Sequence, residues 1–315
     1  MNQFTFIVNP SAGKGGAKKV FNAIRSDLDG RRIAYEFVET TGPGHATDAA
    51  RRAATPAVVS VGGDGTINEV VNGLNGSTAR LGIIPAGSGN DFIKSIGVPR
   101  RPSHALSVLL EGNTRTVDVG TVRCTPGKEG EGNFGTRLFV NGVGVGFDAA
   151  VAARTREIGY LSGTALYILA VLQTLGKYTP PRFTIRSAAF SREARGLLIA
   201  IGNGQCAGGG FYLTPDAAVD DGLLDVCSVD EKNIFQILRL MPKVMRGKHH
   251  NVPGVKFFRS NELVISSDEQ FYVHADGEIV GANVRRVEIG VRAGQINVIS
   301  PGGYEQGSGT GARTA

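Results

Sequence analysis

Tryptophan is missing from the 315-residue chain, and cysteine and methionine occur only three times each. The spacing of Cys124, Cys206 and Cys227 fits neither a disulfide framework nor a zinc cluster, so we expect a reducing cytoplasm. The longest apolar run, residues 165–175, is much shorter than the roughly 20 residues that a membrane-spanning helix needs. The opening sequence MNQFTFIVNP enters a strand at once and leaves no room for a signal peptide. These absences predict a cytoplasmic protein that is at most peripheral to the inner face of a membrane.

Blocks of basic residues are also absent, although the net charge is +6 and the isoelectric point is near 9.3. Without such a block the sequence does not indicate a nucleic-acid groove, and we expect no nucleic-acid partner. The mild basic excess suits an anionic ligand or an anionic membrane surface. A solvated basic surface without any partner explains the charge equally well.

Glycine, by contrast, is abundant, with 45 residues in 315, about twice its usual share of roughly 7%. The glycines have no triplet repeat and gather where apolar runs end. This pattern is typical of tight turns and close backbone approaches, as a phosphate-binding protein requires. A glycine-rich genome with loose loops is the alternative.

The first third of the chain alternates short apolar strands with amphipathic helices. Four buried strands with helices between them predict a parallel sheet covered on both faces. Ligands of such sheets bind beyond the carboxyl ends of the strands, where the glycine-rich segments fall. The predicted strands are residues 4–8, 33–39, 57–61 and 81–85, and the predicted helices follow them around residues 20–28, 46–54, 67–74 and 102–110.

From about Thr116 the pattern changes to β-branched and apolar runs interrupted by two helical stretches, residues 149–176 and 233–246. This composition favours a mostly antiparallel, β-rich two-sheet domain. We therefore predict an α/β domain over residues 1–115, with ligand-binding loops at its strand ends, and a β-rich domain over residues 116–294. The segment 295–301 is predicted to return to the first domain, and the small polar tail 302–315 is predicted to be disordered. The predicted strands of the second domain are residues 137–147, 182–185, 196–201, 223–229, 255–258, 262–266, 271–273 and 284–291.

The segment GGDGTINE, residues 62–69, directly follows a predicted buried strand. Its glycines let the backbone approach a pyrophosphate, and the N–H groups of the following helix can bind it. An aspartate in such a loop repels phosphate unless a cation lies between them, so Asp64 indicates Mg²⁺. The alternative is a plain strand-to-helix turn in which Asp64 caps the helix. The lysine-bearing P-loop and the dinucleotide GxGxxG pattern are not found here.

Two further loops follow predicted strands and repeat this chemistry. The segment 9–15 supplies small residues and one lysine, and the segment 85–92 supplies Ser88 and Asp91. Either loop alone is a weak signal. Because the strand ends of a parallel sheet meet at one edge, we expect all three loops to converge on one crevice.

With these motifs the chain resembles the bacterial diacylglycerol kinase-like lipid kinases, whose catalytic domain is shared with diacylglycerol, sphingosine and ceramide kinases. NAD kinases share the GGDGT element but not the later motifs, and are disfavoured. The motifs that support the resemblance are Asn9-Pro10 with Gly13, residues 62–69, residues 87–92, Gly202-Asn203-Gly204 with Gly208-Gly209-Gly210, residues 215–225, and Asp276-Gly277-Glu278.

The resemblance implies ATP and Mg²⁺ as cofactors and assigns roles to particular residues. The base is the glutamate of the Asp-Gly-Glu segment, Glu278, with Asp276 beside it, and Asp64 orients Mg²⁺ with Asp91. A structural Mg²⁺ site of one aspartate and two backbone carbonyls maps to Asp221, Ala218 and Leu223. The ATP-binding threonine of the family maps to Thr40, but the adjacent Thr41 could be the matching residue instead. The implied nucleotide-binding residues are Asn9, Pro10, Ser11, Ala12, Gly13, Thr40, Gly62, Gly63, Asp64, Gly65, Thr66, Ile67, Asn68, Glu69, Ser88 and Asp91.

The implied function is ATP-dependent phosphorylation of a lipid hydroxyl, with diacylglycerol as the acceptor and phosphatidic acid as the product. The alternatives are another lipid acceptor, such as a sphingoid base, phosphatidylglycerol or a glycolipid, or a non-catalytic lipid- or nucleotide-binding module. A homodimer is left open. The expected partner is the membrane itself, through a basic face with apolar tips formed by Lys14, Arg246, Lys248, Lys256, Phe257 and Phe258.

Overall fold

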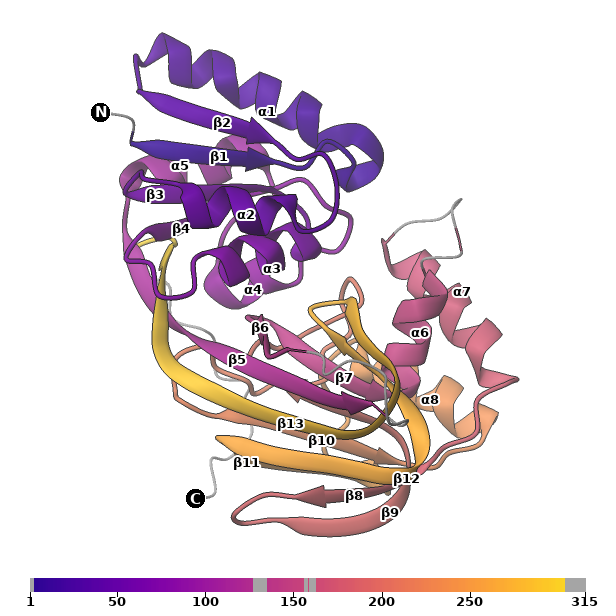
Figure 1. Cartoon of the computed structure of the whole chain (residues 1–315). Helices are drawn as coiled ribbons and strands as arrows, with labels where there is room; N and C mark the ends of the chain where they lie inside the picture. Colours follow the sequence, from indigo (N-terminus) through magenta and orange to yellow (C-terminus); the bar gives the residue numbers. More distant parts are fainter. Residues whose placement is uncertain (1–2, 127–134, 156–157, 159–162, 304–315) are drawn as a thin grey trace.

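A computed structural model describes residues 3–126, 135–155, 158 and 163–303 of the chain. Figure 1 shows an N-terminal lobe, made of β1–β4 and α1–α5, above a larger C-terminal lobe of long strands with three helices at one side. Among the described residues, no helix combines the length and apolarity that crossing a membrane requires.

Four parallel strands form the sheet of the N-terminal lobe. β1 (Phe4–Val8) lies between β2 (Tyr35–Glu39) and β3 (Ala57–Gly62), and β4 (Arg80–Pro85) pairs with the other edge of β3. β1 and β3 are buried along their whole length, as their continuous apolar sequence predicts.

Helices cover both faces of this sheet. α1 (Ala12–Gly30) contacts α5 (Pro102–Glu111), and α2 (His45–Arg52) contacts α3 (Asp64–Gly73) on the opposite face (Figure 1). The short α4 (Phe92–Ile96), which the sequence analysis did not predict, follows the third loop. The chain reverses direction after β2, so right-handed crossovers place helices on both faces of the sheet. Because the four strands are parallel, the loops after β1, β3 and β4 all lie at the carboxyl edge.

Two long antiparallel strands join the lobes: β5 (Thr114–Pro126) and β13 (Glu278–Ile299). The predicted segments 284–291 and 295–299 belong to one strand of 22 residues. Its register against β5 shifts between Arg292 and Ile296, but the strand continues through this irregular stretch because a side chain stabilises it. The buried Asp118 carboxylate accepts the backbone N–H of Gly294 at 2.8 Å there. Beyond this point Val298 pairs in parallel with Leu81 of β4, so the end of β13 lies in the N-terminal sheet.

The C-terminal lobe departs from the predicted elements in three places. The run 137–147 is divided between two strands and a helix, because the N–H groups of residues 140–142 bind a side chain instead of continuing a ladder. The single helix predicted over 149–176 is two helices, and the runs 262–266 and 271–273 belong to one strand. Its elements are β6 (Arg137–Phe139), β7 (Gly142–Gly146), α6 (Phe147–Thr155), α7 (Gly163–Leu175), β8 (Arg182–Arg186), β9 (Ser191–Gly202), β10 (Leu224–Asp230), α8 (Ile234–Val244), β11 (Val255–Ser260) and β12 (Glu262–Ala275).

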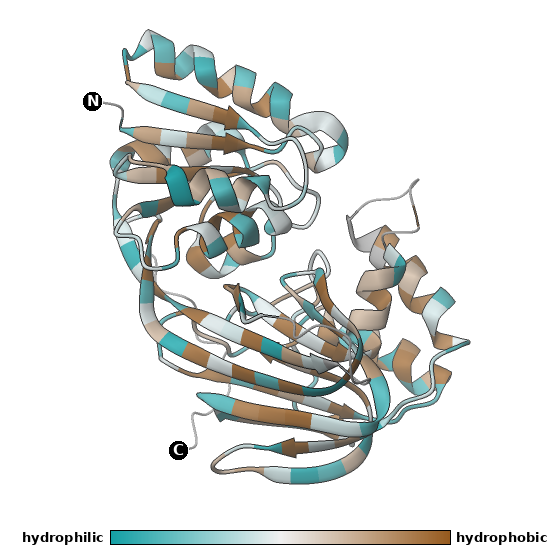
Figure 2. Cartoon of the chain, viewed as in Figure 1, coloured by the Kyte–Doolittle hydropathy of each residue, from teal (hydrophilic) through white to brown (hydrophobic). Residues whose placement is uncertain are grey.

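The described strands of this lobe form one hydrogen-bonded network with the N-terminal sheet, so no break in hydrogen bonding separates the two predicted sheets. β12 pairs with β8 through Val264–Ser266 and with β7 through Val273–Ala275, and its register shifts between these stretches. Bulges bend long strands and let one strand pair with two different partners, so the sheet changes direction while its hydrogen bonding stays continuous. Figure 2 shows hydrophobic segments along the strands of both lobes. The predicted domain boundaries remain predictions, and most of the tail 302–315 lies outside the described residues.

Candidate active site

The three glycine-rich loops contact one another at the carboxyl edge of the N-terminal sheet, as predicted. Gly13 has φ +59°, and a Cβ there would lie 2.2 Å from the carbonyl oxygen of Ala86. A Cβ on Gly87 would lie 2.4 Å from the Cα of Gly63. Such distances exclude any side chain, so glycine is what allows these backbones to pack.

A side-chain hydrogen bond fixes the first loop to the second. Asn9 Nδ2 donates to Thr66 Oγ1 at 3.0 Å, while Asn9 Oδ1 accepts the N–H of Ser11 at 3.1 Å. Thr66 is buried, and its hydroxyl would contact any Cβ placed on Gly62. Asn9 and Thr66 therefore hold together two of the loops that are predicted to bind phosphate.

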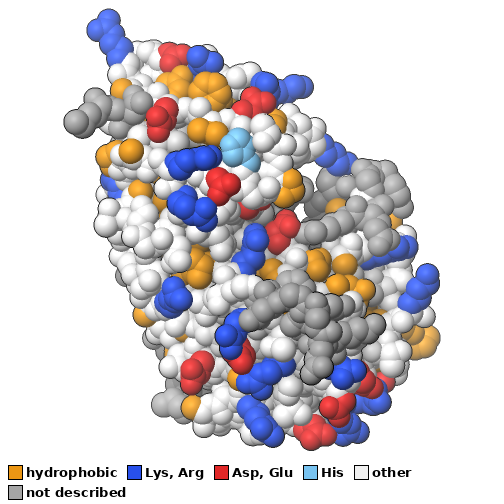
Figure 3. Space-filling view, in the orientation of Figure 1, with side chains coloured by type: hydrophobic (Ala, Val, Ile, Leu, Met, Phe, Trp, Pro, Cys, Tyr) orange, Lys and Arg blue, Asp and Glu red, His pale blue; other side chains and the backbone are white. Residues whose placement is uncertain are grey.

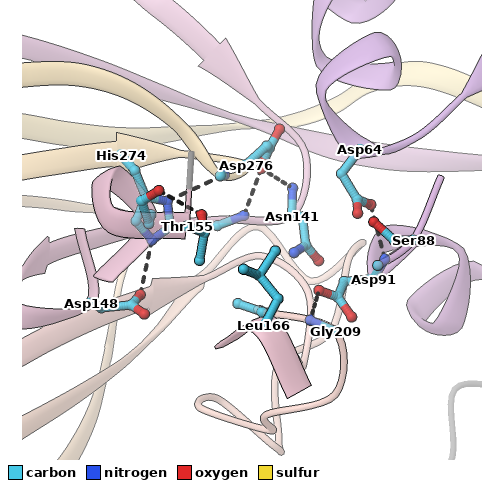
Figure 4. A pocket seen from close by; sticks show the side chains of 16 residues that line it. Asp64, Ser88, Asp91, Asn141, Asp148, Thr155, Leu166, Gly209, His274 and Asp276 are labelled. Atoms are coloured by element: carbon cyan, nitrogen blue, oxygen red, sulfur yellow. Dashed lines mark hydrogen bonds and ion pairs between the residues drawn. The ribbon is translucent and has the colours of Figure 1, made fainter. Parts of the chain in front are cut away.

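Two aspartates lie beside each other where the third loop begins α4 (Figure 4). Asp64 Oδ1 accepts the N–H of Asp91 at 2.9 Å. Burial, and next the neighbouring Asp91 carboxylate, raise the pKa of Asp64 to about 7 from the ordinary 3.8. An inward-facing carboxyl that is costly to ionise favours a divalent cation beside it.

Asp91, in contrast, is already partnered. Its Oδ1 lies 2.6 Å from Lys94 Nζ, and its Oδ2 accepts the N–H of Gly209 at 2.8 Å. Gly209 belongs to the C-terminal lobe, so Asp91 connects the two lobes. The structure thus supports a positioning role for Asp91 in place of the predicted role in orienting Mg²⁺.

The Asp-Gly-Glu segment forms the hairpin between β12 and β13. Asp276 (φ +49°) and Gly277 (φ +83°) are the two turn residues, and Ala275 pairs with Glu278. Positive φ at both positions is the type I′ geometry, which favours Asp-Gly. The half-buried Glu278 points its carboxylate at the second loop, because a Cβ on Gly65 would lie 2.9 Å from Glu278 Oε1. The predicted base therefore lies against the phosphate-binding loop.

Asp276 uses both carboxylate oxygens for structure. Oδ1 accepts the N–H groups of Asn141 and Gly142, each at 2.9 Å, and Oδ2 accepts Asn68 Nδ2 at 2.8 Å and the N–H of Val140 at 3.0 Å. Burial raises the pKa of Asp276, and these four donors oppose the rise. With four donors around it, Asp276 is suited to hold the hairpin and not to accept the substrate proton.

The end of the second motif points away from the loops. Ile67 packs in the core of the N-terminal lobe, Asn68 binds Asp276, and Glu69 Oε2 accepts the N–H of Ala46 at the start of α2 at 3.1 Å. Nucleotide contacts through these three side chains are therefore not supported. Thr40 is buried at the end of β2, where its N–H donates to the Val8 carbonyl oxygen at 2.9 Å.

A pocket of about 270 Å³ opens between the lobes at this site. Its polar side comes from the second and third loops, including the exposed Ser88, and from the Asp-Gly-Glu hairpin. Its apolar side comes from Ala152 of α6 and Leu166 of α7 (Figure 4). A cavity that brings the loops predicted to bind phosphate together with the aliphatic side chains of Ala152 and Leu166 fits a substrate that has a polar and an apolar part.

His274 and Asp148, which the predicted site omitted, line the same pocket. His274 Nδ1 accepts the N–H of Gly277 at 3.3 Å, so Nε2 carries the proton and donates to Asp148 Oδ2 at 2.9 Å. Both side chains are buried over Gly144, where a Cβ would lie 2.2 Å from His274 Nε2. In the sequence only the position of His274, two residues before Asp276, pointed to the site, and nothing indicated Asp148.

The predicted structural metal site shows a different local chemistry. Asp221 Oδ1 accepts the N–H of Leu223 at 3.0 Å, and Asp221 Oδ2 lies 3.7 Å from Arg259 Nη1. Among the described residues there is no group of three or more His, Cys, Asp or Glu side chains with metal-binding geometry. Ala218 and Leu223 could contribute only carbonyl oxygens, so the metal remains a prediction.

The predicted membrane face is not assembled as expected. Phe258 stacks on Phe190 with ring centroids 4.0 Å apart, and Phe257 packs against His250, so neither forms an apolar tip. On the face shown in Figure 3, basic and acidic side chains are interspersed and form no single block.

Comparisons with known proteins agree with this geometry. The family described as "Diacylglycerol kinase catalytic domain" matches residues 3–122, and "YegS C-terminal NAD kinase beta sandwich-like domain" matches residues 141–300. A "Diacylglycerol kinase" of Mycobacterium tuberculosis is 30% identical over 286 residues, which are 88% of this chain and 89% of that protein. A "Probable lipid kinase YegS-like" of Chromohalobacter salexigens is 34% identical over 230 residues, 70% of this chain and 69% of that protein.

Solved structures show the same fold. Crystal structures of a diacylglycerol kinase from Bacillus anthracis superpose with TM-scores of 0.68 and 0.77 at 21% and 24% identity, over 96% of this chain and 97% and 96% of those chains. An NAD kinase from Archaeoglobus fulgidus in complex with ATP superposes more weakly, with a TM-score of 0.51 at 14% identity over 94% of this chain and 93% of that one. The chain belongs to the bacterial family of diacylglycerol kinase-like lipid kinases, enzymes that transfer a phosphoryl group to an alcohol acceptor.

Proposed function

We propose that the protein transfers the γ-phosphoryl group of ATP to the free hydroxyl of diacylglycerol at a membrane surface and forms phosphatidic acid. The observation that supports this most directly is the contact between Glu278 and Gly65. It sets a carboxylate against the loop predicted to bind phosphate, and the neighbouring Asp276 and Gly277 line a pocket that also contains the aliphatic Ala152 and Leu166.

The roles follow from that arrangement. The backbones around Gly13, Gly63 and Gly87 cradle the phosphates, as helix N-termini and glycine loops do in general. Glu278 accepts the proton of the lipid hydroxyl, and Asp276 and His274 hold the hairpin that carries it. Ala152 and Leu166 contact the aliphatic part of the acceptor.

Mg²⁺ fits the residues at this site. It is usually bound through one or two carboxylates together with substrate phosphates, so a cage of several acidic residues is not required. Asp64 would supply the carboxylate; burial and next the neighbouring Asp91 carboxylate raise its pKa, and a bound cation would favour its ionised form. When bound, the ion neutralises charge on the phosphates during transfer.

A different lipid acceptor is the second candidate. Relatives include both diacylglycerol kinases and a YegS-like lipid kinase, and an aliphatic wall accepts many acyl chains. A non-catalytic module is disfavoured, since Asp64, Asp91 and Glu278 are all present. Cytoplasmic location and a homodimer both remain proposals.

The test is phosphoryl transfer from labelled ATP to lipids in mixed micelles. Diacylglycerol, a sphingoid base, phosphatidylglycerol and a glycolipid are offered separately, and labelled phosphatidic acid is the expected product. Glu278→Gln should lower turnover by roughly 10²–10⁴-fold with ATP affinity retained, whereas the exposed control Glu111→Gln should not. Label in another lipid would show that this lipid, and not diacylglycerol, is the acceptor. Wild-type turnover in Glu278→Gln would show that Glu278 is not the base.

A further inference from the structure

Helix α8 exposes apolar side chains that its fold does not require. Ile237, Leu240 and Val244 face the protein and are buried. The outer side nevertheless carries Phe235, which is 72% exposed, and Ile234, which is 48% exposed. A surface helix usually has one apolar face and one polar face. Helix α8 differs, because it has a second apolar face that is exposed to solvent.

The exposed apolar residues form one stripe. At 100° per residue, Ile234, Leu238 and Met245 fall within a narrow sector of the helix, with Phe235 and Pro242 beside it. Leu238 and Met245 are 43% and 38% exposed. The stripe therefore extends along the whole of α8 and into the turn that follows it.

A row of cations borders this stripe. Arg239, Lys243 and Arg246 follow one another at intervals of four and three residues, so they lie on one side of the helix next to the apolar sector. All three are exposed, and none has an ion pair with a described residue. No acidic residue occurs between Ile234 and Lys248.

Helix α7 also exposes an apolar side chain. Leu172 of α7 is 44% exposed, and the neighbouring Ala170 and Val171 belong to the same buried cluster as the inner face of α8. Figure 1 shows α6, α7 and α8 at one side of the C-terminal lobe. Leu166 of α7 packs on that cluster and also lines the pocket, so the buried cluster under α8 extends to the aliphatic lining of the site.

We propose that α8 docks the enzyme on an anionic bilayer, with Ile234, Phe235, Leu238 and Met245 entering the interface and Arg239, Lys243 and Arg246 contacting headgroups. An apolar stripe bordered by Lys and Arg is the pattern of interfacial helices. A second copy of the chain fits less well, because a two-fold contact through this face would bring the cations of both copies together. Only one part of this proposal rests on the proposed function, namely that docking brings the pocket close to its lipid substrate.

The test is sedimentation with vesicles of phosphatidylcholine alone or mixed with phosphatidylglycerol. The wild type should bind the mixed vesicles, and binding should weaken as salt rises. Arg239→Gln with Arg246→Gln should lower the partition coefficient by about fivefold per cation. Phe235→Ser with Leu238→Ser should lower it at least tenfold.

Matched controls separate docking from general surface effects. Tyr272→Ser removes an aromatic residue that is 40% exposed on β12, and Lys19→Gln with Arg31→Gln removes two exposed cations on α1. Neither should change the partition coefficient. The α8 variants should keep the wild-type melting temperature, since their side chains are exposed, and should keep wild-type turnover on a short-chain, water-soluble diacylglycerol.

The outcomes distinguish this proposal from the proposed function. Vesicle binding by the α8 variants equal to that of the wild type would overturn the docking proposal, whatever their activity. A shift from dimer to monomer in these variants, with unchanged vesicle binding, would identify the face as an interface between copies. A wild type that binds through α8 but phosphorylates no lipid would support docking and contradict the proposed function.

Discussion

Replacing Asp64 by Asn should make the protein more stable at alkaline pH while it removes most phosphoryl transfer. The amide can still accept the N–H of Asp91 with Oδ1, and its NH₂ group can donate toward the Asp91 carboxylate. It cannot, however, offset the charge of Mg²⁺ as a carboxylate does. The substitution therefore separates the folding cost of this group from its proposed use.

The magnitude follows from the pKa of Asp64, which is raised from 3.8 to about 7. A folded-state pKa above the unfolded value means that the folded protein binds the proton more tightly. Wild-type stability is then highest below pH 4 and falls as the pH rises toward 7. A shift of about three units corresponds to about 4 kcal/mol. Since the residue is only half-buried and solvent screens part of this, about 2 kcal/mol is expected.

The assay is urea denaturation at several pH values with a chelator present. Asp64→Asn should match the wild type near pH 4 and exceed it by about 2 kcal/mol at pH 8. The control Asp48→Asn, an exposed aspartate paired with Arg51 at 2.9 Å, should show no such pH-dependent gain. Mg-ATP should stabilise the wild type more than Asp64→Asn, because ligand binding adds to folding stability. A variant that is less stable than the wild type at pH 8 would refute the reasoning.

Three further substitutions test the scaffold of the site. Gly13→Ala should destabilise the protein and weaken ATP binding. The control Gly15→Ala, with φ +87° and no atom within 4 Å of its Cβ, should cost only about 1–2 kcal/mol of backbone strain. If both variants weaken ATP binding equally in a titration, close packing at Gly13 is not the reason. Asp276→Asn should lower the unfolding free energy by about 2–6 kcal/mol, because one oxygen must become a donor that faces two N–H groups; a fully stable but inactive variant would make Asp276 the base. Asp221→Ala should lower both the melting temperature and activity, and should abolish the rise in melting temperature with Mg²⁺, if the predicted metal is structural; inactivity at unchanged stability would assign Asp221 to the chemistry instead.

The N-terminal lobe could be predicted well because its signals are local. Continuous apolar runs between glycine-rich turns identified β1, β3 and β4, and the period of Ile67, Val70 and Val71 identified the buried face of α3. The convergence of the three loops followed from the topology of a parallel sheet alone. The family motifs named acidic residues that the structure brings near one pocket, among them Asp64, Asp91 and Asp276, and the roles of these residues remain predictions.

What could not be predicted depends on contacts between distant segments. The division of the run 137–147 comes from Asp276, which lies more than a hundred residues later and takes the N–H groups that a continuous strand would use. The fusion of two predicted segments into β13 depends on the buried Asp118 holding an irregular stretch. Nor does the sequence around Asp148 show that its partner is His274. Local periodicity contains no information about such pairs.

The acidic residues of the motifs have different tasks, although each looks catalytic in the sequence. Asp91 binds Gly209, and Asp276 binds Asn68, so each of them joins the N-terminal lobe to the C-terminal lobe. Phosphoryl transfer depends on in-line placement of donor and acceptor, and here the nucleotide loops and Glu278 come from different lobes. A residue that aligns the lobes is then as necessary for the reaction as one that touches the substrate. In the proposed function Asp64 and Glu278 take part in the chemistry itself, and loss of activity alone cannot assign a role to any of the four acidic residues.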